Sequence, residues 1–239
     1  MSVALVTGGS QGIGRSICEH LADGGYHVLN LSFGKTDWQD RRVTHYDVDL
    51  ADAAATAEIV SELAGQYAVT NVVHNAGVIR AKLVEEVSQD DVEFLSRLHI
   101  GAAVQLVQGF LDAMKAAGFG RVVVISSRAM LGLETRTAYS ATKAGQLGMV
   151  RTLAMELGQH GVTVNAIAPG PIVTPMFTDV VPEGSEQAER IAASLPVKRL
   201  GQPGDIARAV MFLLSPDNGF VTGQCLFVCG GASLGSLAL

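Results

Sequence analysis

The stretch that decides the fold is residues 3–14, with the sequence VALVTGGSQGIG. Its first half, Val3–Thr7, is a short apolar run of the kind that forms a strand buried on both faces of a parallel sheet. Its second half is a glycine-rich turn that opens a helical pattern over Gly12–Asp23. Glycines at this place let the backbone approach a pyrophosphate on the N-terminus of the helix, whereas an isolated glycine cluster is often only a tight turn. Because this cluster directly follows the first strand, we favour dinucleotide binding over a structural turn.

Short apolar runs alternate with longer helical patterns along the whole chain. The predicted strands are Val3–Thr7, His27–Leu31, Val43–Val48, Asn71–His74, Val122–Ser126, Val162–Ile167 and Gln224–Val228. The predicted helices are Gly12–Asp23, Ala51–Leu63, Gln89–Ala117 and Ala138–Gln159. This alternation predicts an α/β fold, a Rossmann-type doubly wound parallel sheet of about seven strands with helices on both faces. Without repeats or linkers, residues 1–239 are expected to form a single NAD(P)-binding domain, in which the less regular residues 171–203 form a lid over a site.

The composition of the 239 residues excludes several classes of protein. A chain with 48% hydrophobic and 17% charged residues is too apolar to be disordered. Its formal net charge of −6 argues against a nucleic-acid-binding surface, which is normally basic. No uncharged apolar run reaches the roughly 18 to 20 residues that span a bilayer, and no charged segment precedes the first apolar run as in a secretory signal. The three cysteines are too scattered for a disulfide framework, and no metal site is expected. We therefore expect a cytoplasmic protein with no membrane or nucleic-acid partner.

The glycine spacing of residues 8–14, G-x-x-x-G-x-G, resembles that of the short-chain dehydrogenase/reductase family. Further motifs of that family follow in order, and together they cover essentially the whole chain. They are Asn75-Ala76-Gly77 after the fourth strand, Ser126-Ser127 at the end of the fifth, Tyr139 and Lys143 at Y-x-x-x-K spacing, residues 165–174, and residues 221–224 followed by Gly230-Gly231. The resemblance implies an oxidoreductase that transfers a hydride between a nicotinamide dinucleotide and its substrate.

Tyr139 and Lys143 lie four residues apart in a helical pattern, so their side chains share one face. A phenol with a pKa near 10 exchanges protons poorly at neutral pH, and a nearby ammonium group lowers that pKa. The resemblance implies that Tyr139 transfers the proton, that Lys143 lowers the Tyr139 pKa and holds the nicotinamide ribose, and that a serine binds the substrate oxygen. Ser127 is the predicted serine and Ser126 is the alternative, because neighbouring side chains on a strand point to opposite faces.

His99 marks a departure from the family pattern, which has an asparagine in this helix that supports a water next to the lysine. An imidazole both donates and accepts hydrogen bonds and titrates near neutral pH, so His99 is a catalytic candidate for the same proton relay. The alternative is that His99 only satisfies a local hydrogen bond within the helix.

The residue at the end of the second strand bears on the choice between NADP and NAD. An acid there binds the adenosine ribose and excludes a 2′-phosphate, but Ser32 holds this position and Lys35 follows, so we favour NADP. NAD is the alternative because Gln11 stands where NADP-preferring relatives often have a basic residue, and Asp37 is near enough to reach the ribose. The predicted cofactor-binding residues are Gly8, Ser10, Gln11, Gly12, Ile13, Gly14, Ser32, Asp49 (or Asp47), Leu50, Asn75, Ala76, Gly77, Tyr139, Lys143, Pro169, Gly170, Ile172 and Thr174.

The activity implied by the resemblance is the interconversion of a ketone and a secondary alcohol. The favoured substrate is a 3-oxoacyl thioester, as in 3-oxoacyl-(acyl carrier protein) reductases, and the alternative is a cyclic or small polar secondary alcohol. A non-catalytic dinucleotide sensor is the alternative from another class of protein. The resemblance also implies a homotetramer in which the long helices Gln89–Ala117 and Ala138–Gln159 pack across an interface. The substrate side is expected to be lined by Arg128, Met130, Leu131, Glu134, Met176 and Phe177.

Overall fold

The computed structural model describes residues 2–234, and its centre is one seven-stranded sheet with the strand order β3-β2-β1-β4-β5-β6-β7. Every neighbouring pair of strands is parallel. The strands are β1 Val3–Thr7, β2 His27–Ser32, β3 Val43–Asp47, β4 Asn71–His74, β5 Gly120–Ile125, β6 Val162–Pro169 and β7 Cys225–Val228. The predicted doubly wound parallel sheet is therefore confirmed.

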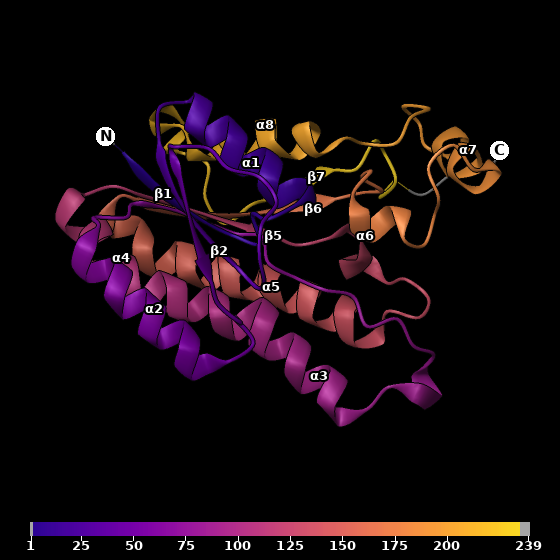
Figure 1. The fold of residues 1–239 in the computed structure, drawn as a ribbon, viewed down its shortest axis with the longest axis horizontal. Helices are drawn as coiled ribbons and strands as arrows, with labels where there is room; N and C mark the ends of the chain where they lie inside the picture. Colours follow the sequence, from indigo (N-terminus) through magenta and orange to yellow (C-terminus); the bar gives the residue numbers. More distant parts are fainter. Residues whose placement is uncertain (1, 235–239) are drawn as a thin grey trace.

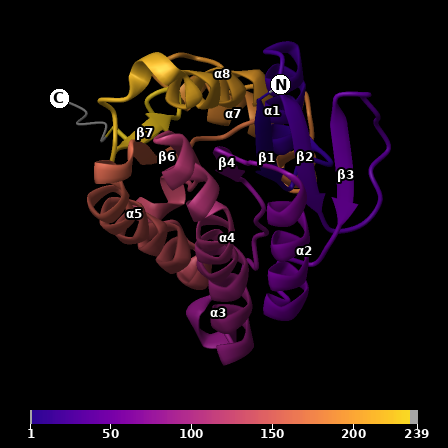
Figure 2. The ribbon, with the colours of Figure 1, turned by 90° about the vertical axis from the view of Figure 1, so that its left-hand side faces the viewer.

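Helices cover both faces of the sheet (Figures 1 and 2). On one face lie α1 Gly12–Asp23 and α8 Pro203–Leu214, and on the other lie α2 Ala53–Gln66, α4 Ala102–Ala117 and α5 Thr137–Leu157. The helix α3 Gln89–Ser96 extends beyond the end of the sheet, and α6 Pro175–Thr178 and α7 Glu186–Ser194 lie together near the right-hand end of Figure 1. No helix among residues 2–234 combines the length and the apolar character needed to cross a bilayer.

The two hydrophobic layers explain why the strand sequences are continuously apolar. In β1, Leu5 packs in the layer with α2, α4 and α5, while its neighbour Val6 packs in the layer with α1 and α8. Both side chains are fully buried, and the same alternation continues in β2 and β4. Phe110 of α4 is the largest fully buried side chain, and truncating such a residue to alanine typically costs 3–5 kcal/mol.

The strand order reverses direction at β1, which lies between β2 and β4. In open α/β sheets the crevice at such a point, beyond the carboxyl ends of the strands, is where ligands bind. The turns after β1 and β4 meet there, because the hydroxyl of Thr7 accepts hydrogen bonds from the backbone N–H groups of Asn75 (3.0 Å) and Ala76 (2.9 Å). The Asn75 side chain in turn donates to the carbonyls of Thr7 and Gly8, both at 3.1 Å.

The structure differs from the predicted elements mainly in the long helix Gln89–Ala117. This segment consists of α3, a widened π-helical turn over Arg97–Gly101, and α4. Single π turns inside α-helices are rare and often occur at functional sites. The other predicted boundaries agree to within three residues, and one difference matters for the site: β5 ends at Ile125, so Ser126 and Ser127 both lie beyond the strand.

Residues 171–203 contain α6 and α7, and the two ends of this segment lie side by side. Ile172 and Gly201 form a parallel bridge, and the N–H of Val173 donates to the carbonyl of Gly201 at 2.9 Å. A segment anchored at both ends in this way can move as a unit between its anchors, so a lid role for residues 171–203 stays a proposal.

Candidate active site

Three predicted catalytic side chains lie close together at the carboxyl end of β5. Ser127 is the second residue after the strand, and Tyr139 and Lys143 lie on the first turns of α5. The Nζ atom of Lys143 is 5.7 Å from the centre of the Tyr139 ring, and the Ser127 hydroxyl lies close enough to the Tyr139 phenol to lower its pKa. The fold thus brings a phenol, a hydroxyl and an amine together beside the crevice.

The two serines after β5 have different surroundings. The hydroxyl of Ser126 is buried and donates to the backbone carbonyl of Lys143 at 2.8 Å, which fixes the start of α5 against the sheet. The hydroxyl of Ser127 accepts from the N–H of Ala129 at 3.1 Å and contacts the Tyr139 phenol. Of the two candidates, the geometry therefore brings Ser127 to the phenol and turns Ser126 away from it.

The electrostatics of Tyr139 differ from the expectation. Desolvation of the phenol raises the pKa of Tyr139 above its usual value, while the hydrogen bond to Ser127 and the positive charge of Arg136 oppose this shift. Lys143 is not among the groups that shift this pKa. Its ammonium donates to the carbonyl of Ile125 at 2.8 Å instead of to the phenol oxygen, so a lowering of the Tyr139 pKa by Lys143 stays a prediction.

Lys143 itself is strongly perturbed, because its amine is surrounded by protein. Its relative exposure is 3%, and burial lowers its pKa from 10.5 to about 7. A buried amine without an anionic partner is costly to charge, and such groups are concentrated at functional sites.

His99 lies in the π turn with 0% exposure and faces the same amine. Its Nδ1 atom is 2.9 Å from the hydroxyl of Thr142, which already donates its proton to the carbonyl of Tyr139 at 3.0 Å. With the Thr142 proton on the Tyr139 carbonyl, Nδ1 of His99 carries the imidazole proton, and Nε2 is a bare acceptor with no hydrogen-bond partner among residues 2–234. Nε2 and the Lys143 Nζ lie 3.0 Å and 3.5 Å from the point that a Cβ on Gly77 would occupy.

The expectation that His99 titrates near neutral pH is wrong. Burial, together with the positive charge of Lys143, lowers the pKa of His99 to about 2. The imidazole is therefore neutral at physiological pH, and it can act only as an acceptor at Nε2.

The glycine-rich loop fits a dinucleotide pyrophosphate. Gly8 and Gly12 have φ angles of +68° and +55°, which favour glycine, and a Cβ on Gly14 would lie 2.0 Å from the carbonyl oxygen of Gly8. The N-terminus of α1 has no side-chain cap among the described residues and no acid in its first turn. Its backbone N–H groups are thus free to bind an anion.

The other predicted cofactor residues surround this loop. Thr174 caps α6 and lies 3.3 Å from the point where a Cβ on Gly12 would stand, so the segment after β6 crosses the loop. Gly170 packs against the backbone of Cys229, Pro169 and Ile172 are buried, and Leu50 is buried behind the exposed Asp49. Ser10, Gln11 and Ile13 lie at the loop surface, partly or fully exposed.

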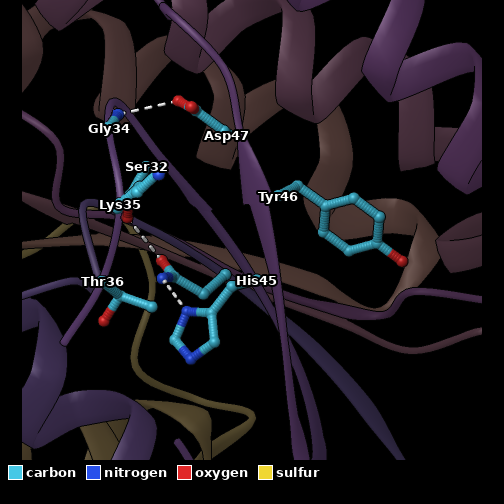
Figure 3. Close-up of a pocket in the computed structure, with 8 residues that line it drawn as sticks. Ser32, Gly34, Lys35, Thr36, His45, Tyr46 and Asp47 are labelled. Atoms are coloured by element: carbon cyan, nitrogen blue, oxygen red, sulfur yellow. Dashed lines mark hydrogen bonds between the residues drawn. The ribbon is translucent and has the colours of Figure 1, made fainter. Parts of the chain in front are cut away.

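Ser32 lies at the wall of a cavity of about 210 Å³ at the ends of β2 and β3 (Figure 3). Lys35 and Thr36 line the same cavity, and the Asp47 carboxylate on its edge accepts from the N–H of Gly34 at 2.7 Å. The hydroxyl of Ser32 is directed inward, where it donates to the side-chain oxygen of Asn30 at 2.8 Å.

Two residues that the sequence analysis missed contact the glycine-rich loop directly. Asn30 accepts a hydrogen bond from the N–H of Gly9 at 2.7 Å, and the indole of Trp38 donates to the carbonyl of Gly9 at 3.2 Å. The signal for Asn30 was present in the sequence, because a polar amide in the middle of an apolar buried strand needs hydrogen-bond partners. Trp38 lies in the loop after β2, where no periodic pattern marks it.

Comparisons with known proteins agree with this geometry. Residues 8–233 match the protein family described as enoyl-(acyl carrier protein) reductase. The chain is 36% identical to the (2S)-[(R)-hydroxy(phenyl)methyl]succinyl-CoA dehydrogenase subunit BbsD of Thauera aromatica, covering 97% of this chain and 96% of that protein. It is also 36% identical to an acetoacetyl-CoA reductase of Rhizobium meliloti, with 96% and 97% covered. Among solved structures, a protein of Beutenbergia cavernae described as an NAD(P)-dependent gluconate 5-dehydrogenase, with NADP bound at low occupancy, superimposes with a TM-score of 0.87 at 34% identity over 96% of each chain.

Proposed function

This chain belongs to the short-chain dehydrogenase/reductase family and is an NAD(P)-dependent oxidoreductase acting on CH–OH groups, and from that premise we propose that it interconverts a 3-oxoacyl thioester and the corresponding 3-hydroxyacyl thioester. We assign the reacting oxygen to Ser127 and Tyr139. The observation that carries this assignment is that Ser127, Tyr139 and Lys143 lie together at the crevice where the glycine-rich loop also ends.

Each of these side chains has a defined part in the proposed reaction. Ser127 donates a hydrogen bond to the substrate oxygen and stabilises the negative charge that develops there. Because its pKa is raised, Tyr139 is protonated at neutral pH, which is the state that delivers a proton to a ketone oxygen. The nicotinamide supplies or accepts the hydride. With a pKa of about 7, Lys143 is charged or neutral according to its surroundings, and its charge favours the phenolate that remains after proton transfer.

We assign His99 the part of an acceptor that faces Lys143. The small space against Gly77 lies between the bare Nε2 of His99 and the Lys143 amine, and it brings both atoms within the reach of one water molecule. His99→Asn, which keeps a polar side chain in this helix, is expected to retain much of the turnover, and His99→Leu is expected to lose most of it. If His99 is only structural, the leucine variant keeps its turnover and loses thermal stability instead.

The proposed cofactor preference is NADP over NAD. The position that would hold a ribose-binding acid is Ser32, and the Asp47 carboxylate nearby is engaged with the N–H of Gly34. Lys35 and Thr36 line a cavity at the same strand end that has room for a phosphate, and two similar solved structures contain NADP. The exposed Gln11 contributes no charge, so the preference depends on Lys35.

The proposed substrate class rests on the relatives. Three similar proteins act on acyl thioesters according to their names: the hydroxy(phenyl)methylsuccinyl-CoA dehydrogenase subunit BbsD, the acetoacetyl-CoA reductase, and the 3-oxoacyl-(acyl carrier protein) reductase of Haemophilus influenzae, which is 32% identical over 97% of this chain. Among the residues expected to line the substrate side, Leu131 and Met176 have exposed apolar side chains, and Arg128 is partly buried. A small polar alcohol is the alternative, favoured by the similarity to the gluconate 5-dehydrogenase structure.

The quaternary state that we propose is a homotetramer. The outer face of α5 exposes Met155, an apolar side chain with 76% exposure that a second subunit would cover. Sedimentation of the purified protein tests this directly, and a monomer at micromolar concentration would contradict it.

The activity is tested by following NADPH and NADH oxidation with acetoacetyl-CoA, a longer 3-oxoacyl thioester and 5-ketogluconate as substrates. We expect the thioesters to be preferred and NADPH to be the better cofactor, with Tyr139→Phe as the control that removes the acid. Turnover of 5-ketogluconate alone would favour the polar alcohol. No turnover of any ketone or alcohol in a broad panel, together with tight cofactor binding, would favour the non-catalytic sensor.

A further inference from the structure

Gly9 in the glycine-rich loop is held from two sides by side chains that lie outside the loop. Its N–H donates to the Oδ1 atom of Asn30 on β2 at 2.7 Å, and its carbonyl accepts from the indole of Trp38 at 3.2 Å. A Cβ on Gly9 would lie 2.5 Å from the same Oδ1, so the loop rests directly on this amide. The position of the loop therefore depends on how the Asn30 amide is oriented.

The orientation of that amide follows from its partners. The N–H of Gly9 and the hydroxyl of Ser32 both donate to Oδ1, so the Nδ2 group must point the other way. There it meets Nδ1 of His45 on the neighbouring strand β3, at 2.8 Å (Figure 3). Since Nδ2 can only donate, Nδ1 must be a bare acceptor. The imidazole of His45 is therefore neutral, with its proton on Nε2.

Protonation of His45 is incompatible with this arrangement. A proton on Nδ1 would face the two N–H bonds of the Asn30 amide, and the contact would become repulsive. Relief requires the amide to turn over, which would place Nδ2 against the N–H of Gly9 and the hydroxyl of Ser32. Both hydrogen bonds that hold Gly9 and Ser32 to Asn30 would then be lost.

Burial is the feature of its surroundings that keeps His45 from being protonated. Its pKa lies below the usual value because the ring is desolvated. Trp38 packs edge-on against the ring at 4.8 Å, and Arg15 of α1 lies over the far part of that indole, 5.3 Å from its centre. The charged and titratable groups of the cavity are Lys35, Tyr46 and Asp47, and the Asp47 carboxylate is bound to the N–H of Gly34.

We propose that Asn30 is a positioning residue for the glycine-rich loop, that neutral His45 locks its amide, and that protonation of His45 releases the loop and weakens dinucleotide binding. The proposal rests on the cofactor role that we proposed above for residues 8–14. We expect the affinity for the dinucleotide to fall as the pH is lowered through the pKa of His45. One buried hydrogen bond corresponds to about a tenfold change in the dissociation constant.

The fluorescence of Trp38 can report the first event of the proposal, which is the protonation of His45. Trp38 is the single tryptophan of the chain and contacts both His45 and Gly9. An imidazolium next to an indole quenches its fluorescence, so the fluorescence of the cofactor-free protein should fall in a step below pH 6.5. His45→Gln, whose amide oxygen can still accept from Asn30 but cannot titrate, should lack this step. Asn30→Asp should move the step to higher pH, because a carboxylate accepts from Gly9 and also stabilises the imidazolium.

The second step is measured by calorimetric titration with NADPH and NADH at pH 7.5 and 5.5. We expect the parent to lose affinity for both nucleotides at pH 5.5, by up to about fivefold because a His45 pKa below 6.5 leaves the ring only partly protonated there, and His45→Gln to lose less than twofold. NADH has no 2′-phosphate, so its affinity does not depend on the titration of that group. Comparing the parent with His45→Gln cancels the pH dependence that all other groups contribute to the affinity. Asn30→Leu should bind about tenfold more weakly at both pH values.

Three results would overturn the proposal. The first is a fluorescence step that persists in His45→Gln, and the second is the same loss of affinity at pH 5.5 in His45→Gln as in the parent. The third is unchanged cofactor affinity in Asn30→Leu while the fluorescence step of the parent is present. That third result would place the failure in the assignment of residues 8–14 to the cofactor, whereas the first two place it in the coupling between His45 and Asn30.

Discussion

Replacing Lys143 with methionine should stabilise the cofactor-free protein at neutral pH while abolishing turnover. The amine is 3% exposed, and burial lowers its pKa from 10.5 to about 7. Between these two values the unfolded chain binds a proton that the folded chain does not, so the free energy of unfolding of the parent rises with pH by about 1.4 kcal/mol per pH unit. Between pH 7 and pH 10.5 the free energy of unfolding of the parent changes by about 5 kcal/mol. Below pH 7 the parent is destabilised by this whole amount, because the buried amine must be charged in the folded protein.

Methionine has a similar length and no charge, so Lys143→Met removes that cost. It also removes the hydrogen bond from Nζ to the carbonyl of Ile125, which is worth about 1–2 kcal/mol when the carbonyl stays buried. At pH 6–7 we therefore expect the variant to be more stable than the parent by about 3 kcal/mol. Near pH 10.5 only the lost hydrogen bond remains, and the variant should be less stable by about 1–2 kcal/mol.

Urea denaturation at half-unit intervals from pH 6 to pH 10.5 measures the difference in the free energy of unfolding between Lys143→Met and the parent. The matched control is Lys115→Met on the exposed side of α4, which should change the free energy of unfolding by less than about 0.5 kcal/mol at every pH. A Lys143→Met protein that is less stable than the parent at pH 7, or a difference that does not vary with pH, would refute the reasoning.

Four further substitutions test the site. Tyr139→Phe keeps the ring and removes the proton carrier, so turnover should fall by about 10² or more with the cofactor dissociation constant nearly unchanged, and a variant with most of its activity would contradict the assignment. Ser127→Ala should lose about 10² in turnover, whereas Ser126→Ala should mainly lose about 1 kcal/mol of stability through its bond to the Lys143 carbonyl; equal kinetic losses would count against the choice of Ser127. Ser32→Asp should shift preference toward NADH and weaken NADPH binding about tenfold, which parallel Michaelis constants will measure, and a parent that already prefers NADH tenfold would disprove the NADP proposal.

The sequence was sufficient to predict the sheet because burial on both faces leaves a local mark. Strands such as β1 and β4 are short and apolar at every position, and they are separated by segments of helical length. The order of the strands and the exact ends of elements depend on packing between distant segments. The π turn at Arg97–Gly101 was not predicted, because its widened backbone follows from tertiary contacts of residues such as His99 and not from a periodic pattern.

The motifs also predicted which residues lie together at the candidate site, but not the electrostatics of those residues. The spacing of Tyr139 and Lys143 predicted that the two side chains are near each other, which is correct. It did not reveal that the Lys143 amine would bond to Ile125 or that burial would raise the pKa of the phenol. A pKa depends on every group that displaces water, and those groups come from β5, the π turn and the turn after β4. The link from Asn30 to His45 was missed for the same reason, since its members lie on two strands.

One neutral histidine, His74, connects the glycine-rich loop with the π turn that contains His99. The hydroxyl of Thr7 accepts from two backbone N–H groups, so it must donate its own proton to Nδ1 of His74 at 3.1 Å. The proton of His74 is then on Nε2, which donates to the carbonyl of Leu98 in the π turn at 3.1 Å. Burial lowers the pKa of His74 to about 3, so this orientation persists at any pH at which the protein is expected to work. Thr7 precedes the glycine-rich loop and Leu98 precedes His99, so the hydrogen bonds from Thr7 through His74 to Leu98 fix the glycine-rich loop relative to the imidazole that faces Lys143.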